Sequence, residues 1–289
     1  MRREEARLDP FDRGFIFGEG IYEGLRSISW KGGCRIVGLD LHVRRMRQGL
    51  KEAGIAWDAG AIGPLSEALV RANGLTDAFV YWQVTGGAPV DGDPVRHRFP
   101  PKGASPTVFG YCEAKPSLSA QTPARAIRVI TAKDIRWELG WVKSISLMGN
   151  VWLARKAEQA GADEAILLRD GMLAEGLATN VILAIPDGRG GTEVVTPSSE
   201  SAPMLAGVTR DLLLRWAPDI RQRAIRHEEL ERATEVMLTG TSMYVAAVVE
   251  IDGRPIGDGA PGPVARRLHK TLLDGYLQGR DVPRSEDAR

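Results

Sequence analysis

One lysine lies in a stretch of sequence where an amine could do chemistry. Lys143 occurs within residues 137–148 (WELGWVKSISLM), where most of its neighbours are apolar. An amine that loses part of its water on burial has a lowered pKa, and a neutral amine can attack a carbonyl group to form an imine. A lysine in such a stretch can also lie at the surface, with its apolar stem on a hydrophobic patch and its charge in water. The local sequence leaves both interpretations open.

A second candidate is a glutamate that follows a predicted hairpin turn. Glu175 lies within residues 173–180 (LAEGLATN), shortly after the Asp170-Gly171 turn. A carboxylate that faces the nitrogen of a pyridine ring keeps that ring protonated, and the protonated ring withdraws electrons. The alternative is an exposed glutamate on a strand, which is common in globular proteins.

Two segments could bind an anion such as a phosphate. Gly207, Val208 and Thr209 begin a predicted helix, where free backbone N–H groups and a hydroxyl are available as donors. Residues 239–242 (TGTS) offer further donors from a predicted loop. Either segment can equally be an ordinary helix start or an ordinary turn. The glycines of residues 18–24 (GEGIYEG) do not have the spacing of a dinucleotide-binding motif.

The composition argues against several classes of protein. The chain has 289 residues, with 38 Lys and Arg against 37 Asp and Glu, so no net field attracts nucleic acid. Two distant cysteines and four scattered histidines favour neither a disulfide framework nor a metal site, and they fit a reducing compartment. No stretch reaches the roughly 18 consecutive apolar residues of a membrane span. We expect a cytoplasmic protein without nucleic-acid, membrane or metal partners.

Hydrophobic periodicity predicts a mixture of strands and helices. The predicted strands share β-branched or aromatic residues and cover 15–28, 79–85, 107–112, 126–131, 165–168, 180–185, 236–239 and 245–251. The predicted helices cover 38–54, 63–72, 151–160 with Asn150 as the cap, 207–217 and 261–276. Strands and helices do not alternate strictly, so we expect an α+β fold with a mixed sheet.

One polar segment predicts a domain boundary. Residues 115–123 (KPSLSAQTP) contain two prolines and have no hydrophobic period. We therefore predict a small N-terminal α+β domain at 1–116, a linker at 117–123 and a larger mixed-sheet domain at 124–289.

Taken in order along the chain, these pieces resemble the fold-type IV enzymes that depend on pyridoxal 5'-phosphate (PLP). The matching motifs are DRGFIFGEGIYEGLR, LDLHVRRM, KSISLMGN, GADEAILLRDGMLAEGLATN, GVTRD and VEIDG, and they span nearly the whole chain. Each motif is modest alone, but their order and spacing are specific. The resemblance implies a two-domain fold with PLP between the domains, and homodimers that form the sites.

The resemblance also implies roles for single residues. Lys143 would hold the cofactor as a Schiff base and carry a proton. Glu175 would partner the pyridine nitrogen. The phosphate would be bound by a set of residues that offer positive charge, backbone N–H groups or hydroxyls: Arg45 of HVRRM with two hydrogen bonds, Val208, Thr209 and Thr241, with Thr179 as a further cofactor candidate.

Within this family the sequence looks most like the D-amino-acid transaminases. In that branch a tyrosine at the position of Tyr22 and an Arg-x-His pair bind the substrate carboxylate. His97 of DPVRHRFP matches the histidine, but Val95 stands at the arginine position. Arg96 would point to the other side of a strand unless the loop, lengthened by VDGD, changes register. Arg26, on the same face of its strand as Tyr22, is an alternative.

We therefore expect a ping-pong transaminase that moves an amino group between a D-amino acid and a 2-keto acid. A site in which no arginine reaches the carboxylate would suit an (R)-amine transaminase. An apolar pocket near Leu177 would suit a branched-chain L-amino-acid transaminase. A PLP lyase similar to aminodeoxychorismate lyase and a PLP-binding dimer without catalysis are the remaining alternatives. The expected partners are a small amino donor, a keto-acid acceptor and a second copy of the chain.

Overall fold

The computed structural model describes residues 3–90, 92–100, 103–119 and 121–281. The chain divides into two compact units, one of residues 1–115 with 142–147, and one of residues 116–141 with 148–289. The sequence alone assigned every residue after 123 to the second domain, whereas here the short segment with Lys143 belongs to the first unit. Ala120 of the predicted linker and Asp91 of the VDGD loop lie outside the described residues.

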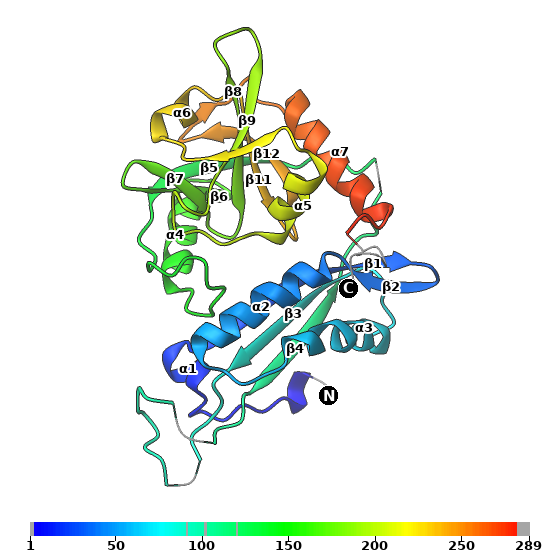
Figure 1. The fold of residues 1–289 in the computed structure, drawn as a ribbon, viewed down its shortest axis with the longest axis vertical. Coiled ribbons are helices and arrows are strands. Elements are labelled where there is room, and N and C mark those ends of the chain that lie inside the picture. Colours follow the sequence, from blue (N-terminus) through cyan, green and yellow to red (C-terminus); the bar gives the residue numbers. More distant parts are fainter. Residues whose placement is uncertain (1–2, 91, 101–102, 120, 282–289) are drawn as a thin grey trace. The chain divides into compact units, whose positions relative to one another are not determined.

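The first unit is built on an antiparallel sheet of four strands in the order β2-β1-β3-β4. The strands are β1 (Gly20–Trp30), β2 (Gly33–Ile36), β3 (Ala78–Thr85) and β4 (Val108–Ala114). The helical elements are η1 (Arg3–Glu5), α1 (Arg13–Phe17), α2 (Leu39–Ala53), η2 (Ala59–Ala61) and α3 (Ile62–Ala72). Figure 1 labels the four strands and the helices α1, α2 and α3.

Helices α2 and α3 cover one face of this sheet. Alternate residues of β1 and β3, such as Ile21, Leu25 and Val80, pack into a buried cluster with Met46 of α2 and Ile62 of α3. The helix α2 ends at Gly54, as predicted, where the glycine N–H donates to the carbonyls of the last turn. The apolar residues that recur every second position in the strands and at helical spacing in α2 thus form this core together.

The residues that alternate with this buried set along the strands point to the other face of the sheet, where they form a row of aromatic side chains. Tyr81 pairs with Tyr111 across β3 and β4, and their rings stack with centroids 5.2 Å apart. The ring centroid of Tyr22 on β1 lies 5.7 Å from the ring centroid of Tyr81. Phe109 continues the row along the edge strand β4 and is 48 % exposed.

The second unit is built on a nine-stranded mixed sheet in the order β10-β9-β8-β11-β12-β5-β6-β7, with β13 paired to β12. Its strands are β5 (Ala126–Lys133), β6 (Glu164–Arg169), β7 (Met172–Gly176), β8 (Asn180–Pro186), β9 (Thr192–Pro197), β10 (Ile220–Arg223), β11 (Glu235–Gly240), β12 (Tyr244–Ile251) and β13 (Arg254–Pro255). Three pairs are parallel, β10 with β9, β12 with β5, and β5 with β6. The prediction of an α+β fold with a mixed sheet is confirmed.

Among the described residues of this unit, the helices are α4 (Met148–Gln159), α5 (Val208–Trp216), α6 (His227–Glu231) and α7 (Pro263–Leu277). Six consecutive residues of β8, 180–185, are buried, so this strand has both faces covered. One face of the sheet belongs to a large apolar cluster that includes Val181 and Leu183. On α4, Leu153 and Ala157 pack on Ala165 and Leu167 of β6.

Several predicted elements differ from the structure. The strand predicted at 15–28 begins at Gly20, because residues 13–17 form the short helix α1. Asn150 does not cap α4, which already begins at Met148, and its side-chain amide instead donates to the carbonyl of Leu177 (2.6 Å). The sequence reading did not identify β7, β9, β10 or α6, which are all six residues or shorter.

Candidate functional site

The segment that carries Lys143 is bound to strand β1 by backbone hydrogen bonds. The N–H of Tyr22 donates to the carbonyl of Lys143 (3.0 Å), and the N–H of Ile145 donates to that of Gly20 (3.0 Å). Ile21 and Ser144 form an antiparallel bridge between these two bonds. Residues 143–145 therefore act as a short additional strand beside β1, which fixes the direction of the lysine side chain.

The amine of Lys143 lies over the ring of Tyr22. Its Nζ is 4.2 Å from the ring centroid, a distance at which a cation is attracted to the face of an aromatic ring. Lys143 and Tyr22 are both half-buried. A half-buried residue with its amine over a ring fits the partly buried interpretation of Lys143 better than a side chain with its charge in water. Burial, together with Tyr22 and Tyr111, raises the pKa of the neighbouring Tyr81 to about 12, so the hydroxyl of Tyr81 stays protonated.

A buried carboxylate holds Arg45 in place. The guanidinium of Arg45 donates from Nε (2.8 Å) and from Nη2 (2.7 Å) to the two oxygens of Glu23, which has no exposed side-chain surface. Burial alone would raise the pKa of Glu23. The charge and hydrogen bonds of Arg45, with those of His42, outweigh this and lower the pKa of Glu23 to about 2. Glu23 is thus an anion that orients the arginine.

His42 completes this cluster one helical turn before Arg45. Its Nδ1 lies 2.7 Å from Glu23. Burial lowers the pKa of His42, and the charges of Arg45 and Lys143 act in the same direction, against the opposing effect of Glu23. Because an ionised carboxylate only accepts hydrogen bonds, the Nδ1 of His42 is the donor. The sequence reading missed Glu23 and His42, although the i, i+3 spacing of His42 and Arg45 on one helix is a detectable signal.

The expected carboxylate-binding residues lie in two different surroundings. Arg26 is 3 % exposed, and its Nη2 lies 3.1 Å from Asp77 Oδ1. Arg96 and His97 are exposed on the loop between β3 and β4. The guanidinium of Arg96 lies 5.7 Å from the centroid of the Phe17 ring. A pocket of about 250 Å³ opens within this part of the first unit.

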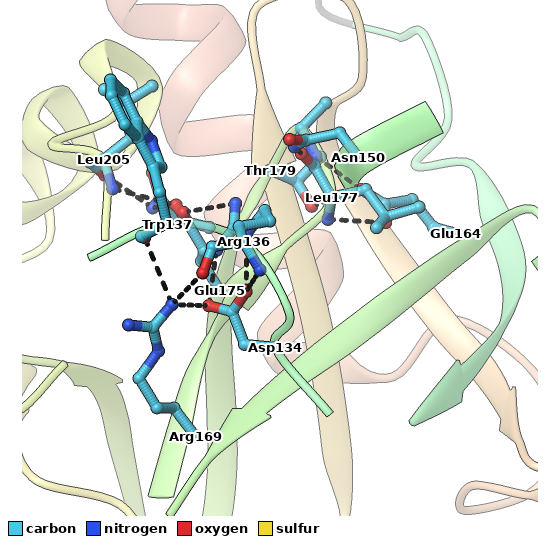
Figure 2. Close-up of polar contacts among 12 residues, drawn as sticks. Asp134, Arg136, Trp137, Asn150, Glu164, Arg169, Glu175, Leu177, Thr179 and Leu205 are labelled. Atoms are coloured by element: carbon cyan, nitrogen blue, oxygen red, sulfur yellow. Dashed lines mark hydrogen bonds and ion pairs between the residues drawn. The ribbon is translucent and has the colours of Figure 1, made fainter. Parts of the chain in front are cut away.

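In the second unit, Glu175 is held by one arginine and two further donors (Figure 2). Arg136 Nη1 lies 2.9 Å from Glu175 Oε1, while the N–H of Leu205 (3.1 Å) and the amide of Asn180 (3.3 Å) donate to Oε2. Burial raises the pKa of Glu175 to about 7, although the charge of Arg136 acts against the increase. Glu175 is 4 % exposed and therefore is not the solvent-exposed strand glutamate of the alternative interpretation.

Arg136 is itself oriented by a second carboxylate. It donates from Nε and Nη2 to both oxygens of Asp134 (3.0 Å each), and Arg169 lies 3.1 Å from the same group, as Figure 2 shows. Burial raises the pKa of Asp134, but the hydrogen bonds and charge of Arg136, with the charge of Arg169, outweigh this and lower it. The side chain that reaches Glu175 is thus fixed on its far side by a bidentate ion pair.

Thr179 belongs to a turn that a buried glutamate organises. Its hydroxyl donates to Glu164 Oε1 (2.9 Å), and the backbone N–H groups of Leu177 (3.0 Å) and Ala178 (3.2 Å) donate to the same carboxylate (Figure 2). Thr179 and Asn180, the residue that contacts Glu175, are therefore set in position together.

The start of α5 lies beside this turn. Gly207 precedes the helix, and a Cβ at this position would overlap Asn180 Oδ1, so a larger residue here would force the Asn180 side chain to move. Val208 and Thr209 then occupy the first turn, whose N–H groups have no partner within the helix. Thr241 follows β11 in the loop next to Gly240, whose Cα faces the methyl group of Thr179.

The structure therefore gathers the predicted residues into two groups, one in each unit. The first unit brings together Tyr22, Lys143 and the Glu23, His42 and Arg45 cluster, with Arg26, Arg96 and His97 elsewhere in the same unit. The second unit brings together Glu175, Thr179, Val208, Thr209 and Thr241. In the part of the chain that the structure describes, no three His, Cys, Asp or Glu side chains are grouped as a metal site. The described helices are all too short or too polar to cross a bilayer.

Comparisons with known proteins identify the relatives of this chain. A model of the family "Amino-transferase class IV" matches residues 20–251. A D-alanine aminotransferase of Bacillus licheniformis is 33 % identical over 285 residues, which are 96 % of this chain and 94 % of that protein. A D-alanine aminotransferase of Staphylococcus aureus (strain N315) is 30 % identical, over 96 % of this chain and 95 % of that protein.

A solved structure supports the same grouping. The T.th. branched-chain amino acid aminotransferase, crystallised with pyridoxamine 5'-phosphate, superimposes with a TM-score of 0.82 at 28 % identity. The match covers 99 % of this chain and 93 % of that one.

Proposed function

This chain belongs to the class IV aminotransferases, and we propose that it transfers an amino group between a D-amino acid and a 2-keto acid. The observation that carries the choice of substrate is the likeness to enzymes named D-alanine aminotransferase, two of which are 33 % and 30 % identical over nearly the full length of both chains. Amino acids and keto acids are the substrates of the family as a whole.

The cofactor of these enzymes is PLP, which when bound supplies an aldehyde for the amine and a ring that accepts electrons. The side chains described above fit such a group. Lys143 offers a partly buried primary amine, and Arg45 offers a fixed guanidinium for a phosphate. Glu175 offers a buried carboxylate, and Val208 and Thr209 offer a helix start with donors.

Lys143 is the proposed catalytic residue. Its Nζ would hold the cofactor covalently, and as a free amine it would take the proton from Cα of the amino donor. The backbone bonds of residues 143–145 to β1 and the ring of Tyr22 hold Nζ in one place through these steps. Precise placement of this kind is what makes a proton transfer efficient.

Glu175 is proposed to keep a pyridine nitrogen protonated. This requires the carboxylate form, which burial disfavours and which the charge of Arg136 supports. The pKa of about 7 means that the ionisation of Glu175 is sensitive to its surroundings. A bound cation would favour the ionised form further, because an opposite charge stabilises a carboxylate.

The phosphate is proposed to be bound by Arg45, by the N–H groups and hydroxyl of Val208 and Thr209, and by Thr241. The ion pair with Glu23 presents the guanidinium of Arg45 in a fixed orientation. Thr179 donates its own proton to Glu164, so it can contact the cofactor only with the remaining lone pairs of its hydroxyl or with its methyl group.

The substrate carboxylate is proposed to be bound by Tyr22, Arg96 and His97. Arg96 and His97 are exposed on their loop and can reach a ligand. Arg26 is buried beside Asp77, and this position favours a structural role for it. The arginine that binds the substrate carboxylate would then be Arg96. In the related enzymes this arginine is expected one position earlier, where this chain has Val95.

We also propose that the protein is a homodimer. The edge strand β4 presents Phe109 and Tyr111, which are 48 % and 38 % exposed, together with Val108 at 37 %. Exposed apolar side chains on an edge strand are typical of a surface covered by a partner. Analytical ultracentrifugation of the wild-type protein and of Phe109→Glu tests this, and a monomeric wild-type protein would contradict it.

A cytoplasmic location is proposed from the use of cysteine. Cys34 and Cys112 are both free, as is usual in a reducing compartment. Cell fractionation tests the proposal, and recovery of the protein outside the cytoplasm would contradict it.

The experiment that tests the proposed function is a screen of single half-reactions. The holoenzyme is mixed with D-alanine, D-glutamate, L-leucine, L-glutamate or (R)-1-phenylethylamine, and loss of the visible absorbance of the bound cofactor is followed. We expect D-alanine or D-glutamate to react fastest and the spectrum to return when a 2-keto acid is added. The second candidate, a branched-chain L-amino-acid transaminase, is favoured by the likeness to the T.th. enzyme. A fast reaction with L-leucine and none with D-alanine would select it.

A further inference from the structure

The loop between β3 and β4 is closed at its base by short backbone contacts. The N–H of Thr85 donates to the carbonyl of Thr107 (3.0 Å). Two residues further along, Gly87 lies so close to the carbonyl of Ser105 that a Cβ would overlap it, and its φ of +77° is left-handed, so glycine is required. The stems are thus fixed, but the described residues of the loop beyond them, 88–90, 92–100 and 103–104, form no helix or strand that would hold the tip.

One arginine from outside the loop reaches into it. Arg13 of α1 donates from Nη1 to the carbonyl of His97 (2.7 Å) and from Nη2 to the carbonyl of Arg98 (3.0 Å). The same guanidinium donates from Nε (2.8 Å) and Nη2 (2.5 Å) to Glu19. The side chain of Arg13 is 6 % exposed, and the ring of Phe17 lies 5.0 Å from its Cζ.

The backbone of α1 is anchored just as firmly. The backbone N–H of Arg13 donates to the carbonyl of Gly87 (2.9 Å). The carboxylate of Asp12, which is 1 % exposed, accepts from the N–H of Gly14 (2.8 Å) and from the hydroxyl of Thr85 (2.9 Å). The guanidinium therefore reaches the loop from a rigid base on β3.

Arg13 also contributes to the lining of the pocket of about 250 Å³. Arg13 lines it together with residues of the loop itself: Pro89, Asp93, Pro94, Val95, His97, Phe99 and Pro100. Among the described residues that line it, Arg13 alone does not belong to the loop. The two backbone carbonyls that it holds belong to His97 and to the next residue, Arg98, so they directly follow Arg96 in the chain.

We propose that Arg13, oriented by Glu19, is a positioning residue that holds the tip of this loop and thereby sets Arg96 and His97 for the substrate carboxylate. The inference rests on the proposed function, because it takes Arg96 and His97 as the residues that meet the substrate. Arg13 acts through the loop and does not itself bind the substrate, since Glu19 and the two carbonyls already accept from all three of its nitrogens.

Limited proteolysis of the holoenzyme gives a readout that does not depend on activity. Trypsin cleaves after arginine, and Arg96 and Arg98 lie in the loop. The variants are Arg13→Lys, whose single ammonium cannot match the four hydrogen bonds, and Glu19→Gln, which keeps Arg13 but removes the charge that orients it. The matched control is Arg44→Lys, which alters an exposed arginine of the same unit, paired with Asp40 on α2.

We expect trypsin to cleave after Arg96 and Arg98 at least about tenfold faster in Arg13→Lys than in the wild-type protein, because hydrogen bonds from a charged donor are lost. We expect the KM for D-alanine and for pyruvate to rise by a similar factor, with kcat within about twofold and with the visible absorbance of the bound cofactor unchanged. Glu19→Gln should shift both measurements in the same direction, and Arg44→Lys should shift neither.

Two results would overturn the proposal. Unchanged proteolysis with a raised KM would mean that Arg13 binds the substrate directly, and faster proteolysis with an unchanged KM would mean that the loop does not position substrate-binding residues. Failure of the proposed function looks different, because the unaltered protein would then show no half-reaction with any amino donor.

Discussion

Replacement of Glu23 by glutamine tests whether the buried cluster of Glu23 on β1 with His42 and Arg45 on α2 stabilises the first unit. The substitution keeps the size of the side chain but removes the charge that Arg45 and His42 share. Arg45 would then keep a positive charge beside a neutral amide in a site where Glu23 has no exposed surface. Removal of one partner from a buried ion pair is strongly unfavourable.

The size of the effect follows from the pKa of Glu23. A pKa lowered from 4.5 to about 2 corresponds to about 3 kcal/mol in the free energy of unfolding, at about 1.4 kcal/mol for each pKa unit. Loss of one partner from a buried ion pair typically costs about 3–5 kcal/mol, which agrees. Because the pKa is lowered on folding, this stability is present above pH 4.5 and is lost as the pH falls toward about 2.

Native-state amide hydrogen exchange of peptides from β1 and α2 measures the opening of this region directly. We expect Glu23→Gln to speed exchange roughly a hundredfold at neutral pH, and the difference from the wild-type protein to shrink below pH 4.5. The control is Asp40→Asn, which removes the exposed ion pair with Arg44 on the same helix and should change the opening free energy by about 0.5 kcal/mol or less. Equal exchange in the two variants would refute the reasoning.

Three further substitutions have defined consequences. Arg136→Met removes the cation that opposes the effect of burial on Glu175, so the pKa of Glu175 rises further above about 7. The acid limb of the plot of kcat/KM against pH should therefore move to higher pH. An unmoved acid limb would argue against the role of Arg136. Gly207→Ala places a Cβ on Asn180 Oδ1. Displacement of the Asn180 amide should weaken cofactor binding by about 1–3 kcal/mol, measured by an absorbance titration. An unchanged affinity for the cofactor would mean that the start of α5 is not part of the phosphate site. Trp82→Phe removes the hydrogen bond from Nε1 to a buried serine hydroxyl (2.8 Å) and should lower the free energy of unfolding by about 1 kcal/mol in a denaturant titration.

The parts of the fold with local signals could be predicted from the sequence. The helix α2 has a clear apolar period and a glycine stop at Gly54, and both were found. The strands β3 and β8 are runs of β-branched and apolar residues, and they were also found. Short strands such as β10, of four residues, have too little sequence to show a period, and β10 forms because it pairs with β9.

In the candidate site too, residues with local sequence signals could be predicted, and their partners from other elements could not. The apolar neighbours of Lys143 made it a candidate, and the resemblance to the family gave it its role. Nothing in its local sequence indicates that residues 143–145 pair with β1, more than a hundred residues earlier. The partners of the expected residues, Glu23 for Arg45 and Arg136 for Glu175, were also missed. Such pairs join separate elements, so they follow from tertiary packing and leave no pattern within a single segment.

The central claim is that Lys143 holds the cofactor covalently. Reduction of the holoenzyme with borohydride fixes that bond permanently, and mass spectrometry of a protease digest then locates the modified residue. We predict the added pyridoxyl group on the peptide that contains Lys143, and its absence in Lys143→Ala. A modified lysine elsewhere in the chain, or no modified lysine in a protein that retains its cofactor, would contradict the account.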